Sequence, residues 1–146
     1  MIVLRPRRLR RTENVRALVR EHRVALDRLV QPIFVVENAA EAGAIESMPG
    51  IARFDLGGAV AEARELFSLG IRCILLFGIP AYKDAVASSA YDPQGIVQRT
   101  IRDIKAALPE MVVAADLCGC EYTSHGHCGI LGGGGDVDND ATLELL

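Results

Sequence analysis

The sequence contains no hydrophobic run that approaches the roughly 18 residues needed to cross a bilayer, so we expect no membrane-spanning segment and no membrane partner. Its N-terminus lacks the pattern of a secretory signal, and residues 1–28 lack the serines that are typical of an organellar transit peptide. We therefore expect a cytoplasmic protein. Hydrophobic residues make up 50% of the chain and charged residues 24%, which is the balance of a soluble globular protein.

Aromatic residues are also scarce, and none precedes Phe34. This matters because residues 1–28 carry nine arginines against three acidic residues, a net charge of +6 that leaves −9 for the rest of the chain. A basic arm can bind nucleic acid, but this one offers no aromatic ring on which a base could stack. Its arginines are interleaved with apolar residues such as Leu9 and Leu18. We predict an arm that packs on an acidic neighbouring copy of the chain in a homo-oligomer, and no nucleic-acid partner.

After the arm, short apolar runs alternate with segments of helical periodicity. The run 72–77 is hydrophobic without alternation, as in a strand buried on both faces of a parallel sheet. Three β/α units in succession predict a parallel α/β architecture, because parallel strands need crossover helices. The pattern does not separate an open doubly wound sheet from part of a barrel. The predicted elements are strands 31–36, 72–77 and 111–117, a loop over 37–50, and helices that begin near Thr12, Leu56, Asp92 and Asp138, the second capped by Gly70.

Three of the four cysteines, Cys118, Cys120 and Cys128, lie within eleven residues of one another, directly after the apolar run 111–115. Three soft thiolates near two histidines and a carboxylate suit a borderline-soft divalent metal such as Zn²⁺. A closed structural zinc site normally has four protein ligands, whereas an open site keeps one position for water or substrate. Three cysteines in a Gly-rich loop at the carboxyl end of a strand fit the open kind better. We predict that these three residues bind Zn²⁺.

Other interpretations of this segment stay open. The cysteines could be packing residues or form a disulfide, although thiols in a cytosolic enzyme are more often metal-binding or catalytic. A thiol-redox function is less favoured because the sequence lacks a Cys-x-x-Cys motif in the usual place. His125 or His127 could be a fourth ligand, whereas Cys73 is interpreted as a packing residue. Asp116 should point to the same side as Cys118 by the period of two, either to orient substrate or as a structural carboxylate.

The segment 116–129 resembles the metal-binding signature of zinc-type porphobilinogen synthase, also called delta-aminolevulinic acid dehydratase. Further blocks resemble that family in the same order, so the resemblance covers essentially the whole chain. It implies about three β/α units from the N-terminal part of a TIM (β/α)8 barrel, with an arm at 1–28 and an incomplete barrel domain at 29–146 that ends within a helix. The matching residues are Asp116, Cys118, Cys120, Tyr122, Gly126, His127, Cys128 and Gly129, with the blocks 5–10, 32–35, 47–50, 75–78, 83–84, 91–93 and 137–146.

The resemblance also implies an activity, which is the condensation of two molecules of 5-aminolevulinate to porphobilinogen, with loss of two waters, in heme biosynthesis. It implies zinc on the three cysteines and a homo-octamer embraced by the N-terminal arms. Family members form Schiff bases through two lysines in the later half of the barrel. The two lysines of this chain, Lys83 and Lys105, stand elsewhere. We therefore expect the isolated chain to be inactive, and the alternative to the enzyme is a non-enzymatic zinc-binding or assembly fragment.

Overall fold

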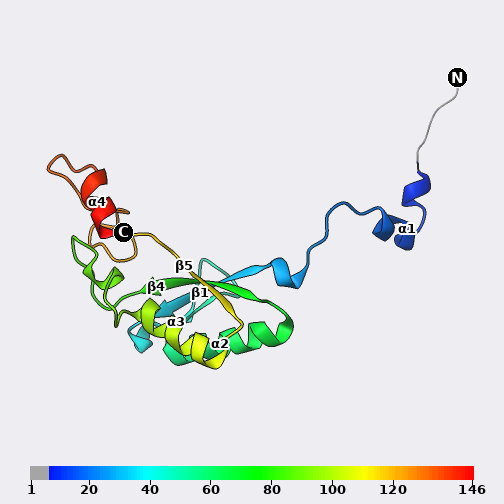
Figure 1. Cartoon of the computed structure of the whole chain (residues 1–146), viewed down its shortest axis with the longest axis horizontal. Helices are drawn as coiled ribbons and strands as arrows, with labels where there is room; N and C mark the ends of the chain where they lie inside the picture. The colour runs from blue at the N-terminus through cyan, green and yellow to red at the C-terminus, as the bar shows by residue number, and fades with distance from the viewer. Residues whose placement is uncertain (1–6) are drawn as a thin grey trace, which may run out of the picture.

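The computed structural model describes residues 7–146, so the first six residues of the predicted arm, including Arg5 of the family-like block 5–10, lie outside it. The described chain alternates between strands and helices, as the sequence predicts (Figure 1). The elements are η1 (Arg8–Arg10), α1 (Glu13–Leu18), η2 (Leu26–Arg28), β1 (Val30–Val36), η3 (Ala39–Glu41), β2 (Gly43–Ala44), β3 (Ala52–Phe54), α2 (Leu56–Leu69), β4 (Cys73–Ile79), η4 (Ser88–Ala90), α3 (Ile96–Ala107), β5 (Val112–Ala115) and α4 (Asn139–Leu145).

The strands form a five-stranded sheet in the order β2-β3-β1-β4-β5. β1 is parallel to β3 and β4, and β4 is parallel to β5, whereas β2 pairs antiparallel with β3. The parallel pairing of β1, β4 and β5 confirms the three predicted strands and places their carboxyl ends at one edge of the sheet. β5 is shorter than the predicted 111–117 because the chain leaves the sheet after Ala115, although the Asp116 amide still donates to the Leu76 carbonyl at 3.1 Å.

The core lies on one face of this sheet, where α2 and α3 both pack (Figure 1). Along β4 the side chains alternate between buried and partly exposed, and the fully buried Ile74 and Leu76 face the helices. The opposite face carries partly exposed apolar side chains, and on it the rings of Phe34 and Phe77 stack with their centroids 5.2 Å apart. The core comprises Ile33, Val35, Ala59, Ala63, Leu66, Ile71, Ile74, Leu76, Ile96, Val97, Ile104 and Met111.

Local side-chain chemistry explains where the helices begin and end. Gly70 ends α2 in the left-handed conformation with φ of 100°, which confirms the predicted cap. Asp138 caps α4, and its carboxylate accepts from the Ala141 amide at 3.1 Å. The predicted start of α3 at Asp92 is wrong, because Asp92 instead forms a turn before the helix. Its carboxylate accepts from Gln94 and its carbonyl from Gly95, both at 2.8 Å, and α3 begins only at Ile96.

The predicted loop over 37–50 also needs correction, since it contains η3 and β2 and leads directly into β3. Strands of two and three residues are too short to produce a recognisable period. β3 lies beside the carboxyl-terminal half of β1, with Phe34 opposite Arg53 and Val35 opposite Phe54. β1 therefore has a second parallel neighbour, β3, that the sequence pattern does not predict.

Residues 7–28 run away from the sheet as an arm that carries the short helix α1 (Figure 1). The Thr12 hydroxyl accepts from the Val15 amide at 3.3 Å, which confirms Thr12 as the cap of α1. Leu9, Leu18 and Val24 are exposed on this arm. A boundary between arm and barrel domain at residue 28 stays a prediction. Within residues 7–146 no helix combines the length and the apolar character that crossing a membrane requires.

Candidate metal centre

The thiols of Cys118, Cys120 and Cys128 converge just beyond the carboxyl end of β5. The Cys118 sulfur lies 3.2 Å from that of Cys120 and 3.3 Å from that of Cys128. All three ligand atoms lie within 4.8 Å of one another. These separations exceed the roughly 2.05 Å of a disulfide, and all four cysteines are free. Two thiolates on a tetrahedral zinc, with bonds of about 2.3 Å, would stand about 3.8 Å apart. The arrangement therefore fits a metal centre and not a disulfide.

A tight turn between the first two cysteines makes this convergence possible. The Gly119 carbonyl accepts from the amides of Tyr122 and Thr123, both at 2.9 Å. Gly119 also lies against the backbone of the returning chain. A Cβ at this position would lie 3.1 Å from the carbonyl carbon of Cys128 and 3.2 Å from its oxygen. Because backbone atoms cannot rotate away as a flexible side chain can, the glycine lets the two cysteine-bearing segments approach each other.

Replacing Gly119 with alanine should separate Cys128 from the other two thiols and weaken metal binding. The added methyl group would force backbone atoms apart, at a cost of about 1–3 kcal/mol in folding free energy. Titration of the purified chain with Co²⁺, followed by its thiolate absorption band, measures the effect. Gly133→Ala is the matched control, because a Cβ at Gly133 would meet no atom within 4 Å. Equal Co²⁺ affinity in the two variants would contradict this explanation of the turn.

The electrostatics of the thiol cluster favour a bound cation. The Cys120 backbone amide and the neighbouring thiols lower the pKa of Cys118. In contrast, its hydrogen bond with Cys118, together with burial, raises the pKa of Cys120 to about 12. Without a cation, one thiolate suppresses ionisation of its neighbours. A divalent cation would compensate three adjacent negative charges, so this donor set fits a metal such as zinc.

Both histidines of this loop lie outside the thiol cluster, which consists of the three cysteines alone among residues 7–146. The His125 Nδ1 accepts from the His127 amide at 3.2 Å, and its Nε2 pairs with the Ala85 carbonyl at 3.3 Å. The His127 Nδ1 pairs with the His125 carbonyl at 3.2 Å. The histidines thus shape the loop, and the geometry does not support either as a fourth ligand. Cys73, at the start of β4, also lies outside the cluster.

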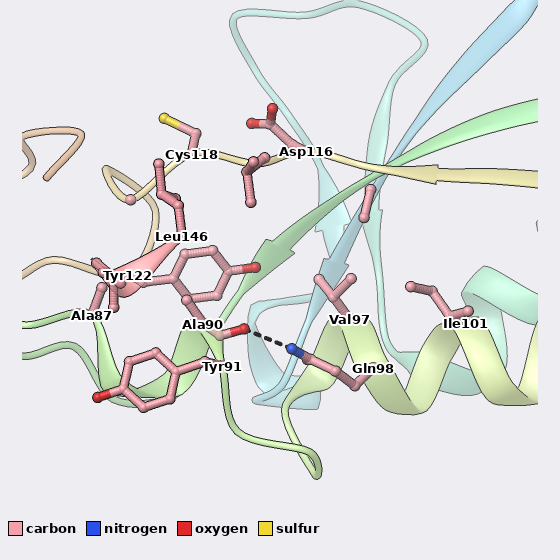
Figure 2. A pocket seen from close by; sticks show the side chains of 14 residues that line it. Ala87, Ala90, Tyr91, Val97, Gln98, Ile101, Asp116, Cys118, Tyr122 and Leu146 are labelled. Carbon is pink, nitrogen blue, oxygen red and sulfur yellow. Dashed lines mark hydrogen bonds between the residues drawn. The ribbon is translucent and has the colours of Figure 1, made fainter. Parts of the chain in front are cut away.

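Asp116 and Cys118 point to the same side of the chain, away from α3, as the period of two predicts (Figure 2). The segment 115–119, with Asp116 and Cys118, forms one wall of a cavity of about 230 Å³. Tyr122 and apolar residues of α3 such as Val97 and Ile101 line it. The Tyr122 ring is 7% exposed, and burial raises its pKa to about 12. The Asp116 carboxylate and the Cys118 thiol therefore lie on one side of this segment, and the Tyr122 ring lies between the segment and α3 (Figure 2).

Sequence reasoning did not identify Glu121 as part of this site. Burial and the nearby Asp116 carboxylate raise the pKa of Glu121 to about 7, although the Gly78 amide and the Lys83 ammonium act in the opposite direction. The position of Glu121 directly after Cys120 was the available signal, but a single glutamate in a polar loop is usually solvated. Only the fold shows that it lies against the end of β4.

The two lysines lie in different surroundings. Lys83, in the loop after β4, is close enough to Glu121 to influence its charge. Lys105, near the end of α3, donates from Nζ to the carbonyls of Pro109 at 2.5 Å and Met111 at 2.8 Å. Those carbonyls precede β5, whereas the cysteines follow it. Lys105 is therefore held at the opposite end of the strand from the thiols.

The loop after β4 and the helix α4 support the metal loop from two sides. The Asp84 carbonyl accepts from the Ser124 amide at 2.9 Å, and the Asp84 carboxylate accepts from the amides of Val86 and Ser88 and from the Ser88 hydroxyl. The Ser88 hydrogen bonds lower the pKa of Asp84. On α4, the Thr142 hydroxyl accepts from the Ile130 amide at 3.0 Å. The segment that carries the cysteines is thus fastened to its neighbours largely through backbone groups.

Comparison with known proteins gives one consistent result. The family model for delta-aminolevulinic acid dehydratase matches residues 3–146. Curated delta-aminolevulinic acid dehydratases are similar to this chain: 46% identity for Halalkalibacterium halodurans, 47% for Synechocystis and 45% for Escherichia coli. The matches cover 97%, 98% and 99% of this chain, respectively. The chain spans 43–45% of the length of these three relatives.

The structural comparison agrees. The crystal structure of the Toxoplasma gondii enzyme, in complex with the reaction product porphobilinogen, superposes with a TM-score of 0.92 and 34% identity. The match covers 99% of this chain and 42% of that one. The sheet and its helices therefore correspond to part of a TIM barrel, which resolves the choice that the sequence pattern left open. The chain belongs to the delta-aminolevulinic acid dehydratase family.

Proposed function

We propose that this chain provides the metal-binding part of a porphobilinogen synthase. This lyase condenses two molecules of 5-aminolevulinate to porphobilinogen, with release of two waters, in the biosynthesis of heme and other tetrapyrroles. The observation that carries the proposal is the convergence of three thiols at the carboxyl edge of the sheet, in a chain that belongs to this family. In barrel enzymes the functional groups lie on the loops at that edge. The family is metal-dependent, and for this chain we propose Zn²⁺.

Each residue of the centre has a proposed role. Cys118, Cys120 and Cys128 would hold zinc as thiolates and leave a fourth position open. When bound, the metal would act as a Lewis acid toward a substrate oxygen. Asp116, on the same side of the chain as Cys118 (Figure 2), would orient the substrate through its carboxylate. Tyr122, which is 7% exposed, would form part of the wall of the cavity beside this segment.

The proposal also covers the oligomeric state and the cellular location of the protein. The exposed apolar residues of the arm, Leu9, Leu18 and Val24, lie among its arginines. Such a surface suits an acidic neighbouring subunit, so we propose a cytoplasmic homo-octamer in which the arm contacts another copy. The absence of an aromatic residue before Phe34 argues against a nucleic-acid partner.

A second function is favoured by the position of the lysines. Lys105 is fastened to carbonyls at the far end of β5, so an imine between its Nζ and a substrate beside the thiols is not feasible in this fold. Lys83 lies nearer, but its loop corresponds to a family segment without that duty. The chain would then be a non-enzymatic zinc-binding or assembly fragment, which binds metal or associates with other subunits.

Borohydride reduction in the presence of 5-aminolevulinate should leave the purified 146-residue chain unmodified, and no porphobilinogen should form. The physical reason for Lys105 is that its amine is held at the far end of β5 from the thiols. For Lys83 the expectation rests on the family resemblance, which gives its loop no Schiff-base role. Mass spectrometry detects the adduct, and a colorimetric assay detects the product. An adduct on Lys83 together with turnover would show that this prediction is wrong.

The same assay separates the two functions when the later half of a relative's barrel is supplied as a second polypeptide. The enzyme proposal predicts porphobilinogen formation that is lost on Cys118→Ala. Zinc binding without product in the reconstituted mixture would favour the non-enzymatic fragment. Reconstitution by the Cys118→Ala chain as effectively as by the parent would contradict the proposed role of the thiols.

A further inference from the structure

Thr123 has no role in the proposed chemistry, yet it is 2% exposed and all of its polar groups are engaged. Its amide donates to the Gly119 carbonyl at 2.9 Å. Its hydroxyl donates to the His127 carbonyl at 2.7 Å. Its carbonyl accepts from the Gly126 amide at 3.4 Å. It also forms a parallel bridge with Asp84 in the loop after β4.

These contacts join the two parts of the metal loop. The Gly119 carbonyl belongs to the residue between Cys118 and Cys120, and the His127 carbonyl belongs to the residue directly before Cys128. A path of two hydrogen bonds through Thr123 therefore connects the first two thiols to the third. Between them Gly126 adopts a left-handed φ of 75°, and a Cβ at this position would meet no atom within 4 Å.

We propose that Thr123 is a positioning residue for the metal centre, whose hydroxyl holds the segment that carries Cys128 beside Cys118 and Cys120. The inference rests on the metal-binding function proposed above. On the far side of Cys128, the Thr142 hydroxyl already holds the Ile130 amide at 3.0 Å. Cys128 is thus fixed from both directions, by Thr123 before it and by Thr142 after it. Loss of a group that orients a metal ligand typically lowers metal affinity 10- to 100-fold.

Thr123→Val tests this directly, because valine keeps the branched shape and removes the hydroxyl. The metal-free chain is titrated with Co²⁺, and the thiolate absorption band reports both affinity and geometry. Thr123→Val should bind Co²⁺ at least tenfold more weakly than the parent, and Thr123→Ser, which keeps the donor, should recover most of the affinity. Thr100→Val is the matched control. Thr100 is also fully buried and donates at 2.7 Å, but to Ile96 within α3.

Alkylation by iodoacetamide, mapped residue by residue, distinguishes a displaced cysteine from an unfolded chain. In Co²⁺-loaded Thr123→Val, Cys128 should react faster than in the parent, while Cys73 on β4 should keep its slow rate. Faster reaction at all four cysteines would mean general unfolding and would overturn the proposal. Parental Co²⁺ affinity in Thr123→Val, or equal losses in Thr123→Val and Thr100→Val, would overturn it as well. Failure of the parent chain to bind Co²⁺ through its cysteines would instead refute the proposed metal-binding function.

Discussion

Replacing Cys118 with alanine should reduce the zinc content of the chain from about one ion per chain to background. The Cys118 sulfur contacts the sulfurs of both Cys120 and Cys128. Its loss leaves only two thiol ligands and removes the sulfur that contacts both of them. Metal analysis after purification without chelators measures the result. Because ligand thiols must lose protons, zinc affinity of the parent should also weaken as the pH falls.

Cys73→Ala is the control for this experiment. Cys73 is partly buried at the start of β4 and lies outside the thiol cluster, so its removal should leave the zinc content unchanged. Zinc retained by a variant that lacks Cys118, Cys120 and Cys128 together would contradict the assignment of the site.

The second large effect concerns the two faces of the sheet. The 146-residue chain should self-associate, because one face presents partly exposed apolar side chains and β5 has an unpaired edge. Leu75→Glu places a charge on that face and should shift the chain toward the monomer, at a cost of about 1 kcal/mol or less in folding free energy. Leu76→Glu, one residue further along β4, places the charge in the core, where Leu76 is fully buried. It should cost about 4 kcal/mol or more and unfold the chain.

Sedimentation and thermal unfolding of the three proteins measure both effects. The neighbouring positions share one strand and differ in the face to which they point, so each substitution is the control for the other. A parent chain that is a stable monomer at micromolar concentration would show that the exposed face does not mediate self-association. Equal destabilisation by the two substitutions would show that both faces are buried.

The parts of the fold that the sequence predicts correctly are those with a strong local signal. The run 73–77 is apolar throughout and lies in the central strand β4, although this structure fully buries only one of the two faces of that strand. Gly70 and Asp138 have the chemistry of helix caps. The start of α3 at Ile96 is harder to predict, because Asp92 and the following proline are as well suited to a turn as to a helix start. In the structure the aspartate accepts hydrogen bonds from the next residues of the turn.

In the candidate site, too, the sequence predicts the features that have a local signal and misses those that depend on the fold. The spacing of Cys118, Cys120 and Cys128 is a local signal, and the alternation of side chains along an extended segment places Asp116 beside Cys118. The choice of a barrel over an open sheet came from the family resemblance and not from periodicity. Thr123 and Glu121 could not be identified from the sequence. Thr123 pairs with Asp84 in the loop after β4, and Glu121 lies against the Gly78 amide of β4. Only folding brings these segments together.

X-ray absorption at the zinc edge of the zinc-loaded chain tests the metal centre most directly, because it counts the atoms bound to the metal. Cys118, Cys120 and Cys128 should appear as three sulfur neighbours at about 2.3 Å, with one lighter oxygen or nitrogen neighbour completing the shell. Two or fewer sulfur neighbours, or a shell dominated by imidazole nitrogen, would contradict the three-thiolate centre and the function built on it.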